Sequence, residues 1–400
     1  MREMKDSGVE WIGAIPIDWK TIKLKYLISI HSGESISNEQ LIEDGAYEVY
    51  GGGEAIGLCN TFNTKASDIL VGRVGARCGC VSYPQNNVWA TDNALVISSN
   101  CNPTFLYYML DSMKLNRLNT SNAQPLITGA KIKNSFIPFI FDKNEQTRII
   151  DFLDNKCAQI DSIIDDIYHQ FVILQEYKQS VITEAVTKGL DKNVAMKDSG
   201  IAWVGKIPAH WDFKKIKYCT EIRDESGIFN PETDTYIGLE NIEGFTATYI
   251  ETTTEYETSK QSICKKGDIM FSKLRPYLGK ILLCPFDGFC TGELLQFKSF
   301  VGEPLFLKYW LLNNEFIKNV DASTYGAKMP RANTPYIINL KIPLPPISEQ
   351  QEIAVFLEDI CAKIDATIIE KQKQLDTLTE YKKSLIYEYV TGKKEVPADA

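Results

Sequence analysis

The feature that most constrains the fold is an internal repeat, because two stretches of this 400-residue chain occur twice. Residues 4–27 and 196–219 match at 13 of 24 positions without a gap. Residues 145–187 and 349–391 form a second repeated block at a constant offset of 204. Internal repeats of this kind indicate an architecture built from copies of one unit. We therefore expect two halves related by a pseudo-two-fold axis.

The first repeated block carries two tryptophans in each half. These are Trp11 and Trp19 in the first copy and Trp203 and Trp211 in the second. Residues that bind a different ligand in each half should differ between the halves, whereas these tryptophans are identical. We therefore expect them to pack between each domain and the repeated helices.

The second repeated block is predicted to form one long helix in each half. An insertion would rotate one face of a helix away from its contacts, so a gap-free repeat of this length favours helix over loop. Apolar residues recur at alternating spacings of three and four, which is typical of a coiled-coil seam. The seam residues expected to pack are Ile150, Leu153, Ile160, Ile164, Phe171 and Leu174 in the first copy and Leu357, Ile364, Ile368, Leu375, Leu378 and Leu385 in the second. We expect the two helices to pair with each other, in preference to each lying on its own domain.

The predicted helices have recognisable ends. Asn144 and Ser348 stand at the expected N-cap positions, and Gly189 and Gly392 follow the last turns. Each helix would then contain roughly 40 residues and extend about 60 Å. Lys178 is the one charged residue in the first seam.

The blocks between the repeats, residues 28–143 and 220–346, share a sparse skeleton at an offset of 200. The matched positions are Asp68, Ile69, Arg73, Gly79, Thr91 and Leu95 in the first block and Asp268, Ile269, Lys273, Gly279, Thr291 and Leu295 in the second. Short β-rich runs alternate with Gly, Asn and Pro turns, and one helix is expected near residues 105–115. We predict a compact α+β domain in each block. One fold with two different surfaces suits a protein that reads two short DNA sequences by similar docking.

Composition narrows the class of protein. No stretch approaches the about 20 uninterrupted apolar residues of a membrane span, and the N-terminus lacks the apolar core of a signal peptide. We therefore expect a cytoplasmic protein whose ten cysteines are free thiols. The formal net charge of -9 counts against a nucleic-acid binder, although an acidic scaffold can carry small basic clefts.

Motifs for catalysis or for a bound ion are weak. Gly51-Gly52-Gly53 has no Lys-Ser or Lys-Thr at the spacing of a phosphate loop, so a turn is the better interpretation. Cys59, Cys78 and Cys80 lack paired CxxC spacing and the chain has three histidines, so no metal is expected. The run from Asn102 to Phe105 lacks the second proline of the Asn-Pro-Pro-aromatic motif of adenine methyltransferases, and a helix cap is the better interpretation. We expect any chemistry to come from other subunits.

Several segments together resemble the specificity subunit of type I restriction-modification systems, over nearly the whole chain. The most specific are SGVEWIGAIPIDW at 7–19, SGIAWVGKIPAHW at 199–211, IPLPP at 342–346 followed by SEQQEI at 348–353, and the two repeated helices. The segments YGGG at 50–53, GRVG at 72–75 and WATD at 89–92 resemble one class of target recognition domain, and YIGLENI at 236–242 and FSKLRP at 271–276 resemble another. One departure is Phe139-Ile140-Phe141, which replaces a Leu-Pro-Pro type run before the first helix.

The resemblance implies an α+β fold class, with two target recognition domains separated by two long helices that form an antiparallel coiled coil. The expected division is a first recognition domain at 1–143, a first helix at 144–190, a second recognition domain at 191–346, a second helix at 347–392 and a C-terminal tail at 393–400. The resemblance also implies a non-catalytic subunit in which each domain reads one half of a bipartite, asymmetric target in double-stranded DNA.

The partners implied by the resemblance are methyltransferase (modification) subunits that dock on the helices and restriction or translocase subunits that join the complex. No cofactor is expected on this chain, whereas the partner subunits would use S-adenosylmethionine, ATP and Mg²⁺. The alternative from another class is a non-catalytic coiled-coil scaffold whose globular domains bind proteins, which the acidic balance would suit.

The candidate DNA contacts are cations within the two variable blocks. Arg73 and Lys273 come first, because they share one place in the skeleton and are flanked by glycines or followed by a proline. Arginine can hold guanine through two hydrogen bonds, and lysine more often serves as a point charge on phosphate. The second tier is Arg77, Lys131, Arg275, Lys328 and Arg331. A solvated surface cation is an equally good interpretation of any one of them taken alone.

Overall fold

The structure, a computed structural model, describes residues 2–119, 125–326 and 328–397. The chain forms two compact units, which are Met1–Asp166 with Lys373–Ala400 (unit 1) and Ile167–Gln372 (unit 2). The boundary falls inside both long helices, because each half of a helix packs on a different globular part. The domain division predicted from the sequence kept each helix whole. Its last segment, the tail at 393–400, extends beyond the described residues after 397.

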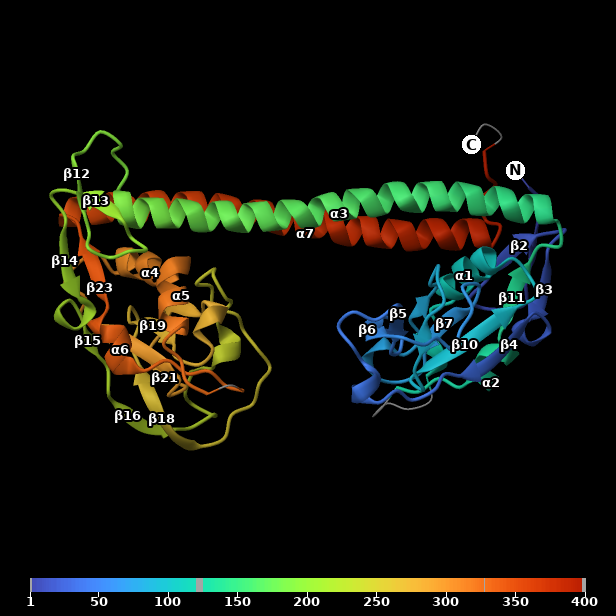
Figure 1. The fold of residues 1–400 in the computed structure, drawn as a ribbon, viewed down its shortest axis with the longest axis horizontal. Coiled ribbons are helices and arrows are strands. Elements are labelled where there is room, and N and C mark those ends of the chain that lie inside the picture. The colour runs from blue at the N-terminus through green and yellow to red at the C-terminus, as the bar shows by residue number, and fades with distance from the viewer. Residues whose placement is uncertain (1, 120–124, 327, 398–400) are drawn as a thin grey trace. The chain divides into compact units, whose positions relative to one another are not determined.

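Unit 1 is built on a four-stranded sheet. Its order is β4 (Ile28–Ser32), β10 (Ala94–Ser99), β7 (Ile69–Gly72) and β8 (Val81–Ser82). The apolar run that forms β7 is buried along its whole length, as expected for a strand whose two faces are both covered. Helix α1 (Pro103–Ser112) lies between this sheet and the long helices of the unit (Figure 1). Asn102 caps α1 by accepting from the backbone N–H groups of Thr104 and Phe105, which confirms the predicted helix cap.

Unit 2 repeats this sheet with the same order and register. Its strands are β15 (Glu221–Ile222), β22 (Leu294–Lys298), β19 (Ile269–Ser272) and β20 (Ile281–Leu283). In unit 1, Ile97 lies opposite Ile69, and in unit 2, Phe297 lies opposite Ile269. The predicted common skeleton is therefore present in the backbone pairing of both domains. A one-residue slip would have turned every apolar side chain to the wrong face, so the shared register indicates a shared core.

The second sheets of the two units differ more. Unit 1 has three strands in the order β6 (Ala55–Cys59), β5 (Tyr47–Tyr50) and β9 (Trp89–Ala90). Unit 2 has four in the order β16 (Ser226–Phe229), β18 (Ser259–Cys264), β21 (Gly288–Cys290) and β17 (Tyr236–Ile237). Both contain one parallel pair, β5 with β9 and β17 with β21. The remaining helices of the domains are α2 (Gly129–Asn134) in unit 1 and α4 (Pro304–Leu312), α5 (Asn314–Asp321) and α6 (Thr334–Asn339) in unit 2.

The first repeated block forms the same small elements in each unit. They are the hairpins β1 (Met4–Asp6) with β2 (Ala14–Pro16) and β12 (Met196–Asp198) with β13 (Lys206–Pro208), and the pairs β3 (Lys20–Lys23) with β11 (Phe136–Phe139) and β14 (Asp212–Lys215) with β23 (Lys341–Leu344). Trp19 and Trp211 are 1% and 0% exposed. Each tryptophan lies against the glycine that ends a long helix, Gly392 and Gly189 respectively, both with positive φ. The predicted packing role of these two tryptophans is confirmed.

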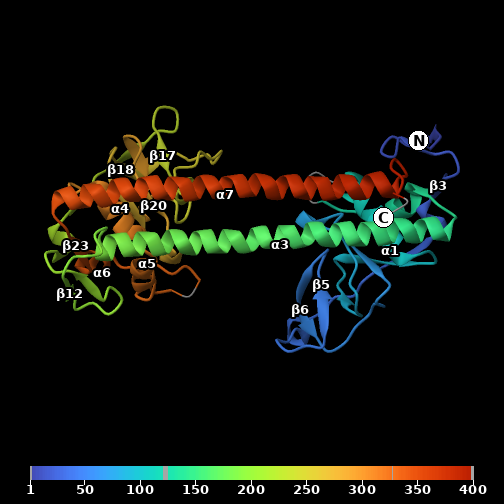
Figure 2. The same ribbon diagram turned by 90° about the horizontal axis from the view of Figure 1, so that it is seen from above.

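The second repeated block forms α3 (Lys143–Lys188) and α7 (Ile347–Val390), which lie side by side in each unit (Figures 1 and 2). In unit 1, the rings of Phe152 and Tyr389 are 4.5 Å apart. In unit 2, Lys178 donates to Asp365 at 2.7 Å, and the end of α3 at Gly189 lies near Glu349 at the start of α7. The predicted antiparallel pairing of the helices is confirmed within each unit.

The ends of these helices differ from the prediction by one or two residues. Helix α3 begins at Lys143, so Asn144 lies inside its first turn. Asp142 takes the capping role, since its carboxylate accepts from the backbone N–H of Asn144 at 2.9 Å. Helix α7 begins at Ile347, which likewise places Ser348 inside the helix. The predicted N-caps were wrong, because the carbonyls of Asp142 and Pro346, two residues earlier in each case, already accept from Gln146 N and Gln350 N.

Candidate nucleic-acid interface

Arg73 and Lys273 occupy the same backbone position in the two domains. Each follows the central strand of its sheet, β7 or β19. The backbone N–H of Arg73 donates to Asn93 O at 3.0 Å, and that of Lys273 donates to Glu293 O at 2.9 Å. The carbonyls of Arg73 and Lys273 accept from Ile127 and Ala332 at 2.9 and 2.8 Å. The turn after the central strand is therefore held from both sides in both domains.

Two residues further on, the same turn carries different residues in the two domains. Gly75 has a φ of 69° and Arg275 a φ of 49°, so both lie in the left-handed region. A side chain at Gly75 would meet nothing within 4 Å. Glycine reaches this conformation without steric cost, whereas arginine is strained there. The second domain therefore keeps a strained arginine at a position that the shared fold leaves open to solvent.

Two more positions complete this region of each domain. Leu126 forms an isolated bridge with Val74, and Arg331 forms the equivalent bridge with Leu274. We use the name variable cluster for the set Arg73, Gly75, Asn93 and Leu126 in unit 1 and the set Lys273, Arg275, Glu293 and Arg331 in unit 2. All four positions differ between the domains, although the backbone that carries them is the same.

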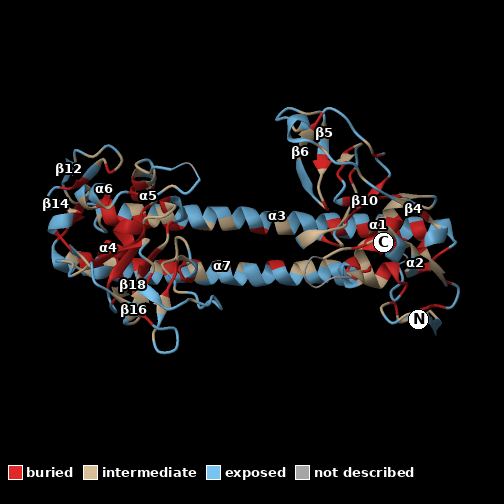
Figure 3. Cartoon of the chain, turned by 90° about the horizontal axis from the view of Figure 1, so that it is seen from below, coloured by how far each residue is buried: buried red, intermediate tan, exposed pale blue. Residues whose placement is uncertain are grey.

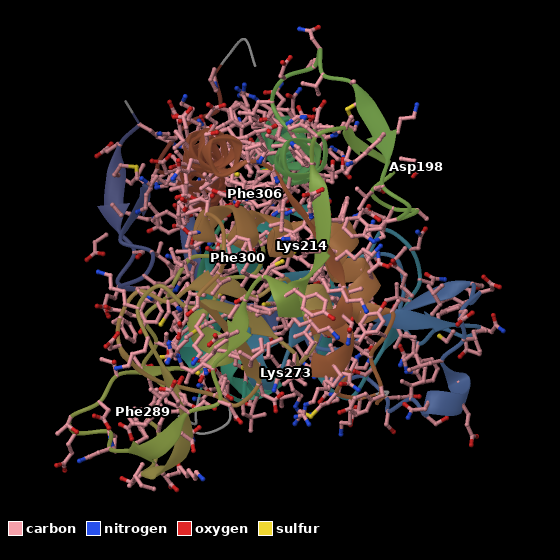
Figure 4. The ribbon with its side chains drawn as sticks, turned by 90° about the vertical axis from the view of Figure 1, so that its left-hand side faces the viewer. Asp198, Lys214, Lys273, Phe289, Phe300 and Phe306 are labelled. Carbon is pink, nitrogen blue, oxygen red and sulfur yellow. The ribbon has the colours of Figure 1, made fainter. Side chains whose placement is uncertain are left out.

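The variable cluster of unit 2 contains a paired arginine. Arg331 Nε donates to Glu293 Oε2 at 3.0 Å, and Arg331 Nη2 donates to Glu293 Oε1. Neither Lys273 nor Arg275 forms an ion pair with a carboxylate in the part of the chain that the structure describes. Phe306 is buried close to the long helices, and Lys273 lies further from these helices, as Figure 4 shows.

The other candidate cations are placed less uniformly. Arg77 forms an ion pair with Glu54, and the Arg73 guanidinium donates to the Ser32 hydroxyl at 3.1 Å. Lys131 lies on α2 and donates to the carbonyl of Leu118 at 3.1 Å, outside the variable cluster. Lys328 is exposed. The structure thus gathers Lys273, Arg275 and Arg331 but not Lys131, and the contact of all seven residues with DNA stays a prediction.

The uncharged and acidic members of the cluster, Asn93 and Glu293, were not among the residues predicted from the sequence. They stand at the offset of 200 that already related the skeleton residues, so the same alignment contained the signal. The predicted contacts were all cations because phosphates attract cations, whereas the side chains that bind base edges also include Asn and Glu.

Three cysteines of unit 2 lie close together in its core, apart from the variable cluster. Cys264 and Cys290 lie in the buried core of unit 2 together with Cys284. Contact with Cys284 lowers the pKa of the Cys264 thiol, but contact with Cys290 and burial outweigh it and raise that pKa to about 12. Such thiols are poor nucleophiles at neutral pH. Within residues 2–119, 125–326 and 328–397, no group of three His, Cys, Asp or Glu side chains could hold a metal ion.

The long helices bury the predicted seam and expose much of their remaining surface (Figure 3). Every seam residue expected to pack is buried or half-buried. Large apolar side chains are also exposed on the helices. They are Ile163, Tyr168, Val172, Ile173 and Tyr177 on α3 and Ile347, Val355, Phe356, Ile369 and Tyr381 on α7. Among the described residues, none of the helices combines the length and the hydropathy that a membrane span requires.

The fold and the variable clusters define a protein of two like domains that present unlike polar surfaces. The family profile described as "Type I restriction modification DNA specificity domain" matches residues 16–168 and 210–377. This chain therefore belongs to the family of type I restriction-modification DNA specificity subunits.

Individual relatives agree with this assignment. The type I restriction enzyme EcoDI specificity subunit of Escherichia coli is 26% identical over 383 residues, which cover 90% of this chain and 84% of the relative. The MjaVIII specificity subunit of Methanocaldococcus jannaschii is 28% identical over 258 residues, 60% of this chain and 58% of the relative. A solved structure from a study of complex assembly and conformational transition of the type I R-M system has a TM-score of 0.66 at 13% identity, over 95% of this chain and 99% of that one. That likeness shows the shared fold.

Proposed function

We propose that this chain is the DNA-reading subunit of a type I restriction-modification complex, in which each domain reads one half of a bipartite, asymmetric target. The observation that carries the proposal is the pair of domains with one β-sheet register and different residues in the variable cluster. A shared scaffold makes both domains dock on DNA in a similar way, while different side chains at the docking surface read different bases.

An exchange of domains tests the proposal. Residues 28–143 are replaced by the corresponding block of another specificity subunit, and the chain is expressed with its modification subunits in a host without other methylation. Sequencing of the methylated genome should show that one half of the target changes and the other half is kept. The reciprocal exchange of residues 220–346 serves as the matched control and should change only the other half. A change in both halves, or in neither, would contradict the proposal.

Salt dependence separates this function from a protein-interaction scaffold, which the net charge of -9 would suit. Phosphate contacts release counterions, so the logarithm of the DNA affinity should fall linearly with the logarithm of the salt concentration, by about 0.9 for each phosphate contacted. We expect a steep loss for the assembled complex on its target duplex. A flat response would favour the scaffold.

The long helices are proposed to dock the modification subunits. Apolar side chains exposed to water are costly unless a partner covers them, and the helices carry such side chains outside the seam. Tyr177 and Tyr381 occupy the same position of the repeat and are 51% and 55% exposed. Two copies of one partner subunit could therefore meet equivalent tyrosines, one on each helix.

Catalysis is proposed to lie outside this chain. The sequence has no glycine-rich phosphate loop with a following Lys-Ser or Lys-Thr and no complete Asn-Pro-Pro-aromatic motif. Under this proposal the modification subunits bind S-adenosylmethionine, and the restriction subunits use ATP and Mg²⁺. The purified chain alone should transfer no methyl group to DNA that carries the target, whereas the complex should.

A further inference from the structure

The pairing of Arg331 with Glu293 leaves one edge of the guanidinium available. Glu293 accepts from Nε and from one hydrogen of Nη2. The remaining edge, formed by Nη1 and the second hydrogen of Nη2, has no acceptor among the described residues, and the side chain is 45% exposed. An arginine edge with two parallel N–H groups matches two acceptors that lie side by side.

The local charge favours a base edge over a phosphate as the ligand of this edge. A carboxylate 3.0 Å from the guanidinium compensates its charge and would repel a phosphate. Guanine presents two neutral acceptors in the major groove, O6 and N7, at the spacing that an arginine fork can span. The carboxylate also fixes the plane of the guanidinium, which reduces the entropy lost when the arginine binds a base.

The backbone of Arg331 is held from two sides. Its N–H donates to Tyr325 O at 3.1 Å, and its carbonyl accepts from Tyr325 N at 3.3 Å. On the other side, Arg275 N donates to Pro330 O and Ala332 N donates to Lys273 O, each at 2.8 Å. A side chain on such a segment starts from a fixed point, as a residue that discriminates bases requires.

The first domain lacks both members of the pair. The position of Arg331 is taken by Leu126 and that of Glu293 by Asn93, while the surrounding backbone bonds are kept. The arginine and its carboxylate therefore change together between domains of one fold. Residues that support the common scaffold would be kept in both domains. Residues that change together are expected where the two domains differ in the ligand that they recognise.

We propose that Arg331, held by Glu293, reads a guanine in the half of the target recognised by the second domain. Arg331 is the specificity-determining residue and Glu293 is its positioning residue. The proposal rests on the proposed function, since it assumes that the variable cluster of unit 2 faces DNA.

The first experiment measures the target sequence of variants in the assembled complex. Arg331→Ala, Arg331→Lys and Glu293→Gln are each expressed with the modification subunits, and methylated sites are found by genome sequencing. We expect one G·C position in one half of the target to become relaxed, with a fall in discrimination of about 5- to 150-fold for Arg331→Ala. Lys318→Ala is the matched control, because Lys318 also pairs with a glutamate, Glu315, but lies on α5 outside the cluster. It should keep the wild-type target.

A second experiment identifies the contacted atoms. Replacing the guanine by 7-deazaguanine removes the N7 acceptor and keeps base pairing. The affinity of the wild-type complex for this duplex should fall by roughly five- to tenfold, and that of the Arg331→Ala complex should not fall further. Arg331→Lys, which keeps the charge but not the fork, should behave like Arg331→Ala on this duplex.

The outcomes separate failure of this inference from failure of the proposed function. An unchanged target for both Arg331→Ala and Glu293→Gln overturns the inference, as does a uniform loss of methylation without a relaxed position, which would indicate a phosphate contact. Should Arg331→Ala fail to assemble, Glu293→Gln still tests the same position. If the wild-type complex shows no bipartite target, the proposed function itself is wrong.

Discussion

Arg275 offers a test in which stability and DNA binding should change in opposite directions. Its φ of 49° places a residue with a β-carbon in the left-handed region, where the equivalent residue of the first domain is Gly75. Arg77 and Arg331 each form an ion pair with a glutamate, whereas Arg275 forms none in the described part of the chain. The turn holds its backbone, because the Arg275 N–H donates to Pro330 O and its carbonyl accepts from Leu278 N, so the arginine side chain is not needed for this conformation. We expect Arg275→Gly to keep the fold and to weaken the binding of DNA.

The magnitude follows from two opposing effects on stability. A residue with a β-carbon in the left-handed region costs about 1–2 kcal/mol, which glycine would relieve. Glycine also increases the freedom of the unfolded chain, which costs about 0.5–1 kcal/mol. The net change should lie between zero and about 1.5 kcal/mol in favour of the variant. For a unit of this size, that is an increase in Tm of at most about 6 °C.

The expected loss in DNA binding is larger. The Arg275 guanidinium pairs with no carboxylate among the described residues, and Lys273 lies two residues before it in the chain, so Arg275 is suited to a phosphate contact. Losing one hydrogen bond to a charged group costs about 1.5–3 kcal/mol, or about 10- to 150-fold in affinity. The slope of log affinity against log salt should fall in magnitude by about 0.9.

Thermal unfolding of the full chain and anisotropy of a labelled target duplex with the assembled complex provide the two readouts. Arg275→Asn is a second variant, because asparagine tolerates the left-handed region and carries no charge. Gly75→Arg is the mirror control, and it should lower the stability of unit 1 by about 1 kcal/mol. A clear fall in the Tm of Arg275→Gly would show that the arginine is structural. An unchanged affinity and salt slope would refute its contact with DNA.

Two further predictions concern the long helices. Asp365→Asn leaves Lys178 buried in the seam without its carboxylate and should lower the free energy of unfolding by about 2–3 kcal/mol. Asp161→Asn, at the equivalent but more exposed pair, should lower it by about 0.5 kcal/mol. Equal small losses for both variants in urea unfolding would show that burial of the lysine is unimportant. Tyr177→Glu and Tyr381→Glu should each weaken co-purification of the modification subunit, and the double variant should abolish it, without a change in helix content by circular dichroism. Normal assembly of the double variant would exclude this face as the docking surface.

The sequence was sufficient to predict the helices because their signal is long and regular. Strict spacing of apolar residues over some 40 positions, present twice, leaves few alternatives to a paired helix. The common register of the central sheets was also predictable, since Asp68, Thr91 and Leu95 keep their spacing in the copy. The helix starts were missed because capping depends on one residue whose backbone conformation the sequence does not define, and Asp142 and Asn144 are both good caps.

The variable cluster was only partly predictable, for a physical reason. Arg331 and Glu293 are 38 residues apart, and their contact depends on the bridge that brings the segment of Arg331 beside the turn after β19. No local pattern announces such a contact. Residue type alone identifies arginines and lysines, but it does not distinguish Arg331, which has a carboxylate partner, from Lys131, which donates to a carbonyl outside the cluster.

Two residues break the local rules of this sequence, and the structure accounts for them differently. Lys178 is a charge in an apolar seam, but both oxygens of Asp365 accept from its ammonium at 2.7 and 2.8 Å, so its burial is compensated inside the protein. The equivalent pair of the repeat forms the same contact, because Lys382 donates to Asp161 Oδ1 at 2.6 Å. A buried charge that bonds one residue on the facing helix also disfavours every other alignment of the two seams, as a polar residue does in a coiled coil. Arg275 has a strained backbone whose N–H and carbonyl are hydrogen-bonded, but its guanidinium pairs with no carboxylate among the described residues. We therefore expect a ligand to engage this guanidinium, and for a member of this family the expected ligand is DNA.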